Sequence, residues 1–323
     1  MRVLITGMNG FAGSHLADLL IAETHWLLIG ASRNASGERT SPRMSWWNLD
    51  LRDADAVKRL IKLERPDLVI HLAAQPYVPA AWDDPWATFE MNVRPQQNLF
   101  DALLASRLTP RILIASSVEV YGPPSDTGDL PFRETRPTMP VNPYGVSKVA
   151  QEAMALQYRR SHGLDVVVAR PFNHIGPRQT MSSAANQFAQ QIAEIEAGLR
   201  EPVLRVGNMT AQRDFSDVRD VARAYLGLIR LGEPGEIYNI CSGQPRSVQA
   251  LLDILLSKSH KTIAIEPDPA RIRPADTLIS YGSNEKLSAV TGWAPRIPFE
   301  QTVSDILDDW RERVRTAPAP MSS

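Results

Sequence analysis

The stretch "RVLITGMNGFAGSHLADLL", residues 2–20, decides the fold prediction. It begins with an apolar run of strand length and continues into a pattern typical of a helix. Gly7, Gly10 and Gly13 lie at the turn between the two. Glycines let the backbone approach a pyrophosphate closely, and the positive end of the following helix attracts that group. The stretch therefore predicts a dinucleotide-binding site, and a purely structural tight turn is the alternative interpretation.

Four further apolar runs extend this first unit into a sheet. They have the length of buried strands, and candidate helices lie between them; they are "WLLIGAS" (26–32), "DLVIHLAA" (67–74), "RILIASS" (111–117) and "LDVVVARPF" (164–172). Right-handed crossovers between parallel strands place helices on the faces of the sheet. The expected fold class is therefore α/β, with a Rossmann-type doubly wound parallel sheet and a smaller C-terminal α/β lobe.

The pattern loosens after about residue 172, which suggests a domain boundary. Residues 1–172 are expected to form an NAD(P)-binding Rossmann domain. Residues 173–315 are expected to form mainly a substrate-binding lobe, with helices at 184–198 and 247–258 and some segments returning to the sheet domain. The tail at 316–323, which includes "APAPMSS", has the composition of a disordered end.

Composition limits the classes of partner. The 323 residues are 43% hydrophobic, which is enough to bury a sizeable core. With 35 basic and 36 acidic residues and no long block of one sign, neither nucleic acid nor a membrane surface is expected as a partner, and no metal site is expected. The single cysteine, Cys241, excludes an intrachain disulfide and is expected to be a small buried side chain. No secretory signal or transmembrane run appears, so the expected location is the cytoplasm.

The end of the second strand indicates which dinucleotide binds. NAD-selective sites usually carry Asp or Glu there, whereas "IGASRN" offers Ser32 and Arg33 and no carboxylate. Arg33 can bind a 2′-phosphate in a fork, although a solvated surface arginine is the alternative. The pattern favours NADP(H), with NAD(H) as the second choice. Asp50, after "WWN", is expected either to accept a hydrogen bond from the adenine amine or to cap a strand end.

The stretch "VNPYGVSK", residues 141–148, carries the candidate catalytic chemistry. Tyr144 and Lys148 are four residues apart and so share one face of a helix, where the ammonium is expected to lower the pKa of the phenol. A tyrosine tuned in this way can donate a proton near neutral pH, and the lysine can also hold the nicotinamide ribose. Ser117, at a strand end, can hydrogen-bond the same substrate oxygen. Ordinary amphipathic packing of the helix is the alternative.

Six motifs resemble those of the extended short-chain dehydrogenases/reductases that act on nucleotide sugars. They span nearly the whole chain: "TGMNGFAG" (6–13), "HLAAQ" (71–75), "SSVEVYG" (116–122), "NPYGVSK" (142–148), "RPFNHIGP" (170–177) and "RDFSDVRDV" (213–221). The resemblance implies that Tyr144 gives a proton to a 4-keto oxygen while Ser117 steadies that oxygen and Lys148 tunes the tyrosine. The implied cofactor contacts, besides Tyr144 and Lys148, are Gly7, Asn9, Gly10, Phe11, Gly13, Ser32, Arg33, Asp50, Leu51, Leu72, Ala73 and Ala74.

The resemblance also implies where a nucleotide sugar binds. Asn173 would contact the sugar or its phosphate, and Arg213 and Arg273 would bind the diphosphate, because a near-neutral protein needs local cations for that group. Asp276 would accept a hydrogen bond from the nucleotide ribose. Surface or loop roles are the alternatives for these residues. His174 is expected to be a hydrogen-bonded structural histidine.

Within that family, the "FNHIGP" form, the "RIRPADT" segment and the modest length are most similar to GDP-6-deoxy-D-mannose reductases. The expected reaction is therefore the NAD(P)H-dependent reduction of the 4-keto group of GDP-4-keto-6-deoxy-D-mannose to GDP-D-rhamnose. Glu119 stands where the 4,6-dehydratases of the family carry the carboxylate that removes a C5 proton. The preceding Val118 cannot donate a proton to a leaving hydroxyl, which favours a reductase.

Three alternatives to this activity stay open. GDP-mannose 4,6-dehydratase is the first and a nucleotide-sugar 4-epimerase the second. A non-catalytic NADPH-binding regulator or scaffold comes from a different class and is disfavoured because Tyr144 and Lys148 are both present. The resemblance further implies a homodimer formed through helices 84–106 and 143–162, whose apolar stripes are equally explained by packing on the parent sheet.

Overall fold

A computed structural model describes residues 1–34, 41–180, 183–268 and 278–316, and its main feature is a parallel sheet of seven strands. The strand order is β10-β6-β5-β4-β1-β2-β3. The strands are β1 (Arg2–Thr6), β2 (Leu27–Ser32), β3 (Met44–Asn48), β4 (Leu68–His71), β5 (Arg111–Ala115), β6 (Asp165–Pro171) and β10 (Ile237–Ile240). This confirms the predicted fold class. The order reverses beside β1, and ligands of such sheets bind at that switch point, outside the carboxyl ends of the strands.

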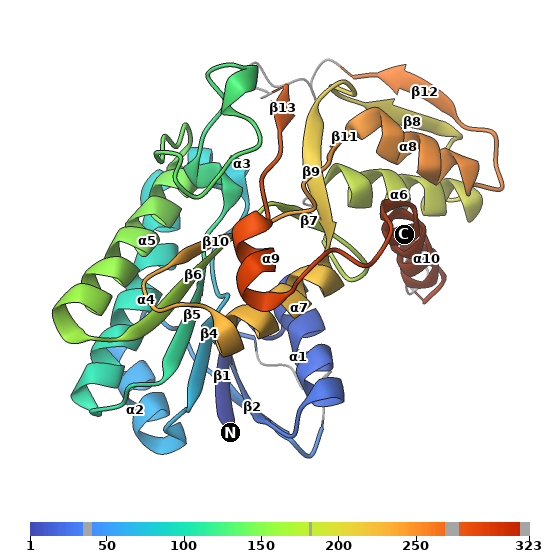
Figure 1. Ribbon diagram of the computed structural model, residues 1–323. Coiled ribbons are helices and arrows are strands. Elements are labelled where there is room, and N and C mark those ends of the chain that lie inside the picture. The colour runs from blue at the N-terminus through green and yellow to red at the C-terminus, as the bar shows by residue number, and fades with distance from the viewer. Residues whose placement is uncertain (35–40, 181–182, 269–277, 317–323) are drawn as a thin grey trace.

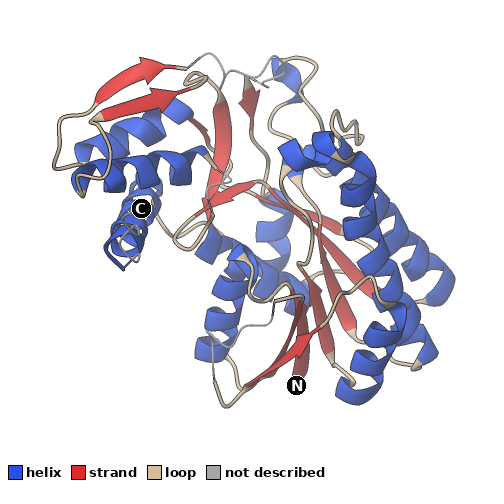
Figure 2. Ribbon diagram, turned by 180° about the vertical axis from the view of Figure 1, so that it is seen from behind, coloured by secondary structure: helices blue, strands red, loops and turns tan. Residues whose placement is uncertain are grey.

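Helices cover both faces of the sheet, as Figure 2 shows. One face packs against α1 (Phe11–Glu23), α7 (Val218–Leu231) and α9 (Glu285–Thr291). The other packs against α2 (Ala54–Glu64), α4 (Pro85–Ala105) and α5 (Pro143–His162), and the short α3 (Val78–Asp83) precedes α4. Because both faces are covered, β1, β2, β4, β5 and β6 read as continuous apolar runs, which is why the sequence revealed these five strands; β3 and β10 were not among the predicted runs.

The C-terminal half builds a second, smaller group of elements (Figure 1). In it β9 (Gln212–Asp217) pairs with β7 (Asn173–Ile175), β11 (Pro245–Ser247) and β13 (Ile279–Ser280), and β8 (Val203–Val206) pairs with β12 (Ala264–Pro267). Three helices pack together around their own apolar cluster: α6 (Ala184–Glu196), α8 (Val248–Ser257) and α10 (Phe299–Thr316). The helices predicted at 184–198 and 247–258 are confirmed.

Some segments after residue 172 lie in the sheet region. Strand β10 pairs with β6, and α7 and α9 pack on the sheet. The division into a domain at 1–172 and a lobe at 173–315 remains our proposed assignment. Helix α10 ends at Thr316, and residues 317–323 of the predicted tail lie outside the described residues.

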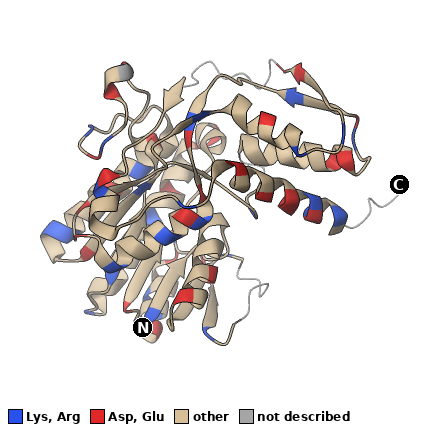
Figure 3. Cartoon of the chain, turned by 45° about the vertical axis from the view of Figure 1, so that its right-hand side comes forward, with Lys and Arg blue, Asp and Glu red and all other residues tan. Residues whose placement is uncertain are grey.

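Acidic and basic residues are interspersed along the described chain (Figure 3). Helix α10 has Glu300 in its first turn and Arg313 and Arg315 in its last, an arrangement that complements the helix dipole. In the described ranges no helix has both the length and the apolar character needed to cross a bilayer.

Candidate active site

A cleft of about 1560 Å³ opens at the carboxyl edge of the sheet. Its walls come from the glycine turn, the ends of β4 and β5, the start of α5, and β7 and β9 of the smaller lobe. It is lined by all the predicted site residues that the structure describes: Gly7, Asn9, Gly10, Phe11, Gly13, Ser32, Arg33, Asp50, Leu51, Leu72, Ala73, Ala74, Ser117, Glu119, Tyr144, Lys148, Asn173 and Arg213. Arg273 and Asp276 lie outside the described residues. Candidates distant in sequence are thus brought to one place.

The glycine turn has the form of a phosphate cradle. Gly7 has a φ of +71°, and a Cβ on Gly13 would lie 2.2 Å from the carbonyl oxygen of Gly7. Helix α1 begins directly after Gly10, which has no side chain to cap the first N–H groups, and its first turn carries no acidic residue. A turn without side chains that leads into an uncapped helix N-terminus suits an anionic pyrophosphate. The residues present therefore fit the predicted dinucleotide.

The end of β2 offers polar groups to the same cleft. The buried Oγ of Ser32 has no hydrogen-bond partner among the described residues, and the exposed Arg33 follows it. Asp50 is already engaged, because its carboxylate accepts hydrogen bonds from the guanidinium of Arg52, with a shortest distance of 2.7 Å. That contact lowers the pKa of Asp50. Ser32 and Arg33 suit a ribose phosphate, whereas the adenine contact of Asp50 stays a prediction.

Local capping positions the helix that carries the candidate catalytic pair. The Oδ1 of Asn142 accepts a hydrogen bond from the backbone N–H of Gly145 at 2.8 Å, and Pro143 occupies the first turn of α5. Tyr144 and Lys148 then lie on one buried face, with the Lys148 Nζ 5.8 Å from the centroid of the tyrosine ring. The side chain of Ser117 lies close enough to Tyr144 to lower the pKa of its phenol, which places all three groups together.

The titration behaviour of this group differs from the expectation. Burial raises the pKa of Tyr144 above its usual value of 10, and the charge of Glu119 raises it further, while the hydrogen bond to Ser117 opposes both. The prediction that Lys148 brings this pKa towards neutrality is wrong for this structure, because desolvation dominates and the ammonium donates to the carbonyl of Ala115 at 2.8 Å. Burial lowers the pKa of Lys148 to about 8. Tyr144 is consequently protonated at neutral pH.

Glu119 lies in the cleft next to the start of α5. Its Oε2 accepts a hydrogen bond from the Nδ2 of Asn142 at 2.7 Å. The preceding Val118 is buried in an apolar cluster with Tyr121 and Phe172. The side chain before Glu119 is therefore a packing residue, and a catalytic role for Glu119 stays a prediction.

The smaller lobe supplies the opposite wall of the cleft. Asn173 lies on β7 and Arg213 on β9, where an Nη1 of Arg213 donates to the carbonyl of Gln212 at 2.9 Å. His174 donates from Nδ1 to the carbonyl of Phe172 at 3.0 Å, and its ring is parallel to that of Phe11 at a centroid distance of 5.7 Å. Burial lowers the pKa of His174. These contacts agree with the structural role expected of this histidine.

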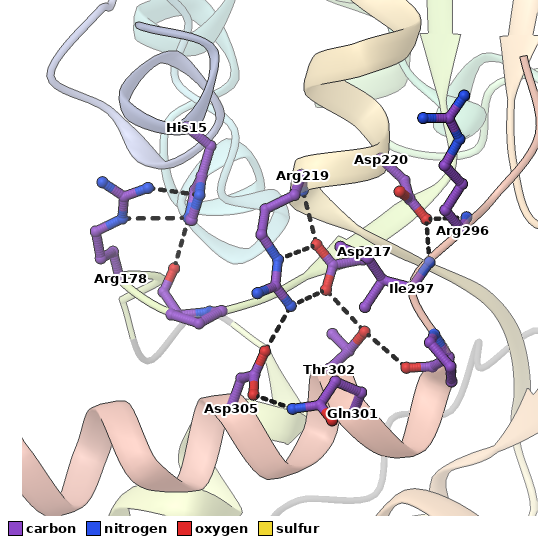
Figure 4. Close-up of polar contacts among 12 residues, drawn as sticks. His15, Arg178, Asp217, Arg219, Asp220, Arg296, Ile297, Gln301, Thr302 and Asp305 are labelled. Atoms are coloured by element: carbon purple, nitrogen blue, oxygen red, sulfur yellow. Dashed lines mark hydrogen bonds and ion pairs between the residues drawn. The ribbon is translucent and has the colours of Figure 1, made fainter. Parts of the chain in front are cut away.

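Arg178 also lines the cleft and was not assigned a role from the sequence. Its backbone has a φ of +70°. The Nη1 of Arg178 donates a hydrogen bond to Asp18 at 2.8 Å. The same guanidinium contacts the ring of His15, and Figure 4 shows this contact. Its backbone N–H donates to Asp309 at 2.9 Å. Arg178 thus ties α1, which follows the glycine turn, to α10 of the smaller lobe.

A second set of contacts in Figure 4 continues this connection. Arg219, at the start of α7, donates from Nη2 to Asp217 at 2.7 Å and to Asp305 of α10 at 2.6 Å. Thr302 donates to the same carboxylate of Asp217 at 2.8 Å. Asp217 and Arg219 lie within the "RDFSDVRDV" motif, but their contact with α10 was not predicted, because Asp305 is 86 residues from Arg219. The contact of Arg178 with His15 was not predicted either, because these residues are 163 positions apart.

Comparison with known proteins gives the relationships of the chain. Residues 4–306 match the family described as GDP-mannose 4,6 dehydratase. The chain is 41% identical to a GDP-6-deoxy-D-mannose reductase of Pseudomonas aeruginosa, covering 97% of this chain and 98% of that protein. The solved structure of RMD from Pseudomonas aeruginosa complexed with NADPH superimposes with a TM-score of 0.86 at 39% identity, covering 97% and 99% of the two chains.

A more distant structure shares the fold. The UDP-glucose 4-epimerase of Thermus thermophilus, solved as a complex with NAD, has a TM-score of 0.85 at 31% identity and covers 96% of this chain and 99% of its own. The chain belongs to the GDP-mannose 4,6-dehydratase family, within the extended short-chain dehydrogenases/reductases.

Proposed function

We propose that this protein reduces the 4-keto group of GDP-4-keto-6-deoxy-D-mannose to give GDP-D-rhamnose (GDP-6-deoxy-D-mannose), with NAD(P)H as reductant. The observation that carries the proposal is the buried Tyr144 side chain, which lines the same cleft as Ser117 and the glycine turn. Burial keeps the Tyr144 hydroxyl protonated, as a reduction requires of its proton donor. The similarity to a curated reductase over nearly the full length supports the same substrate.

The residues of the cleft then have separate tasks. When bound, the nicotinamide cofactor supplies the hydride. Tyr144 donates its proton to the keto oxygen, so that one hydride and one proton are added across the C=O bond. The Ser117 hydroxyl donates a hydrogen bond to that oxygen and stabilises the charge developing on it. The Lys148 ammonium stabilises the phenolate that remains after the transfer. Asn173 and Arg213 are proposed to hold the sugar diphosphate from the opposite wall.

NADP(H) is the favoured cofactor, with NAD(H) as the alternative. Replacing Arg33 with alanine is expected to raise the dissociation constant for NADPH by about 10–100-fold, because a charge-assisted pair with the 2′-phosphate is lost. Binding of NADH, which lacks that phosphate, should change little. Fluorescence titration with each cofactor measures both constants. The exposed Arg59 of α2, replaced in the same way, is the control. An equal loss for the two cofactors would contradict the role of Arg33.

GDP-mannose 4,6-dehydratase is the competing activity, because the family bears that description and Glu119 lines the cleft. Elimination of water also needs a proton donor for the leaving hydroxyl, and Val118 cannot supply one. Two incubations separate the activities. NADPH with GDP-4-keto-6-deoxy-mannose should give cofactor oxidation. Oxidised cofactor with GDP-mannose should give no keto product. A keto product without net change of cofactor in the second incubation would establish the dehydratase instead.

We also propose that two copies associate through α4 and α5, which pack against each other in the chain. At their N-terminal ends a groove of about 540 Å³ is lined mainly by apolar residues of these helices and of the segments just before them, including Trp86, which is 73% exposed, and Val146, which is 46% exposed. Pairing of two such surfaces would bury them. Light scattering should then give twice the chain mass of 35.8 kDa.

The proposed location is the cytoplasm, supported by the single buried, unpaired thiol of Cys241.

A further inference from the structure

One face of α5 carries three buried polar residues at a spacing of four. Tyr144, Lys148 and Glu152 follow each other along this face and are 7%, 3% and 4% exposed. They lie against residues 115–117, which follow one another at the end of β5. Each residue of this short segment contacts a different member of the helix face, and these contacts join Ser117 to Tyr144, the carbonyl of Ala115 to Lys148, and Ser116 to Glu152.

In the third of these contacts, the carboxylate of Glu152 accepts hydrogen bonds from two side chains. The hydroxyl of Ser116 donates to Oε1 of Glu152 at 2.5 Å, and Arg170 of β6 donates to Oε1 and Oε2 at 2.8 and 2.6 Å. Ser116 and Arg170 are each only 3% exposed. Charge-assisted hydrogen bonds of this kind restrict both geometry and distance. The carboxylate of Glu152 is therefore fixed to two adjacent strands and ties α5 to both.

Glu152 also acts on the charge of Lys148. Burial favours the neutral amine of Lys148, and the carboxylate of Glu152 opposes this by raising its pKa. The other titratable groups beside Lys148 are Tyr144, whose ring it faces, and His71 on β4. Burial lowers the pKa of His71 to about 3, so this imidazole is neutral near pH 7. Among the described residues, Glu152 is thus the carboxylate that acts on the ammonium.

We propose that Glu152 is a positioning residue for the reduction: held by Ser116 and Arg170, it sets the register of α5 on the strand end and supplies the counter-charge of Lys148. This register of α5 places both Tyr144 and Lys148 in the cleft. The part of this inference that concerns turnover rests on the proposed function, whereas the part that concerns Lys148 does not.

The first test measures Lys148 directly. In protein labelled with ¹³C-lysine, the ε-carbon shift of Lys148 is followed against pH and assigned with Lys148→Arg. In Glu152→Gln the midpoint is expected to fall by about one pH unit, because an opposite charge is lost in a buried site. The matched control is Glu196→Gln, which also removes a carboxylate paired with an arginine, Arg311, but in the smaller lobe. An unchanged midpoint in Glu152→Gln would overturn the proposal.

The second test measures turnover. In Glu152→Gln, the decrease of kcat at alkaline pH is expected to move to lower pH by the same amount as the midpoint of Lys148. Ser116→Ala keeps the charges of Glu152 and Lys148, so it is expected to lower kcat without changing the pH at which kcat decreases. Parallel losses of kcat and melting temperature with an unmoved pH profile would show a structural role alone and overturn the proposal.

If Glu152→Gln fails to fold because Arg170 is left unpaired, the double variant Glu152→Gln/Arg170→Met removes both charges and is titrated in its place. A fall in the midpoint for Lys148 is again the expected result. Absence of turnover in the unaltered protein would overturn the proposed function, and the NMR midpoint would still decide whether Glu152 acts on Lys148.

Discussion

Replacing Tyr144 with phenylalanine is expected to lower kcat for the ketone reduction by about 10³-fold, since a positioned general acid typically contributes two to four orders of magnitude. Phenylalanine fills the same buried space, and the group lost is the hydroxyl beside Ser117. Binding of NADPH should be nearly unchanged. Stopped-flow or steady-state oxidation of NADPH in the presence of the keto sugar measures the first quantity, and fluorescence titration the second.

A control of the same chemistry lies on the same helix. Tyr158 donates its hydroxyl to Asp101 at 2.6 Å, away from the cleft, so Tyr158→Phe should retain kcat. If Tyr144→Phe also retained kcat, Tyr144 would not be the proton donor. If Tyr144→Phe lost no activity in any assay, the result would instead favour a regulator or scaffold that binds the cofactor without turnover.

Replacing Gly13 with alanine is expected to weaken NADPH binding by at least about 100-fold, which corresponds to roughly 2.7 kcal/mol. The added methyl carbon would lie 2.2 Å from the carbonyl oxygen of Gly7 and 2.8 Å from the Cα of Met8. Both neighbours are backbone atoms, so the clash cannot be relieved by rotating a side chain. The turn has to open, and overpacking of this kind costs about 1–3 kcal/mol or more. Fluorescence titration gives the affinity, and circular dichroism reports whether the fold persists.

The exposed Gly128 provides the comparison. A methyl group there would meet the Oδ1 of Asp126 at 3.0 Å, and this exposed side chain, which accepts a hydrogen bond from the Gly128 N–H at 2.7 Å, can shift without moving the backbone. Gly128→Ala should therefore bind NADPH like the unaltered protein. Full affinity in a folded Gly13→Ala variant would show that the turn tolerates a side chain, which would argue against its role as a phosphate cradle.

The main sheet could be predicted because its strands are buried on both faces and therefore appear as unbroken apolar runs. Strand β10, with the short sequence "IYNI", does not stand out in this way, and its place beside β6 depends on a pairing between segments far apart in the chain. Strands β7 and β9 contain polar or charged residues and border the cleft, and β11 has only three residues. Periodicity alone could not identify them.

The candidate site was predictable where spacing determines position. A separation of four residues places Tyr144 and Lys148 on one face of α5, as the structure shows. The direction of the pKa change of Tyr144 could not be obtained in this way, because it depends on burial in three dimensions. Glu152 continues the same spacing on α5, but its partner Arg170 lies on strand β6. The positive φ of Arg178 has no counterpart in the sequence pattern.

The late position of β10 in the sequence has a consequence for synthesis. Ribosomes produce the chain from its N-terminus, so β1 to β6 emerge well before residues 237–240, which complete the edge beside β6. Until then the hydrogen-bonding groups along that edge of β6 remain open, and such an edge can pair with another nascent chain. Translation beyond Ile240 closes it. A stop codon or a long pause ahead of that point is therefore expected to produce an aggregating polypeptide rather than a free-standing nucleotide-binding module.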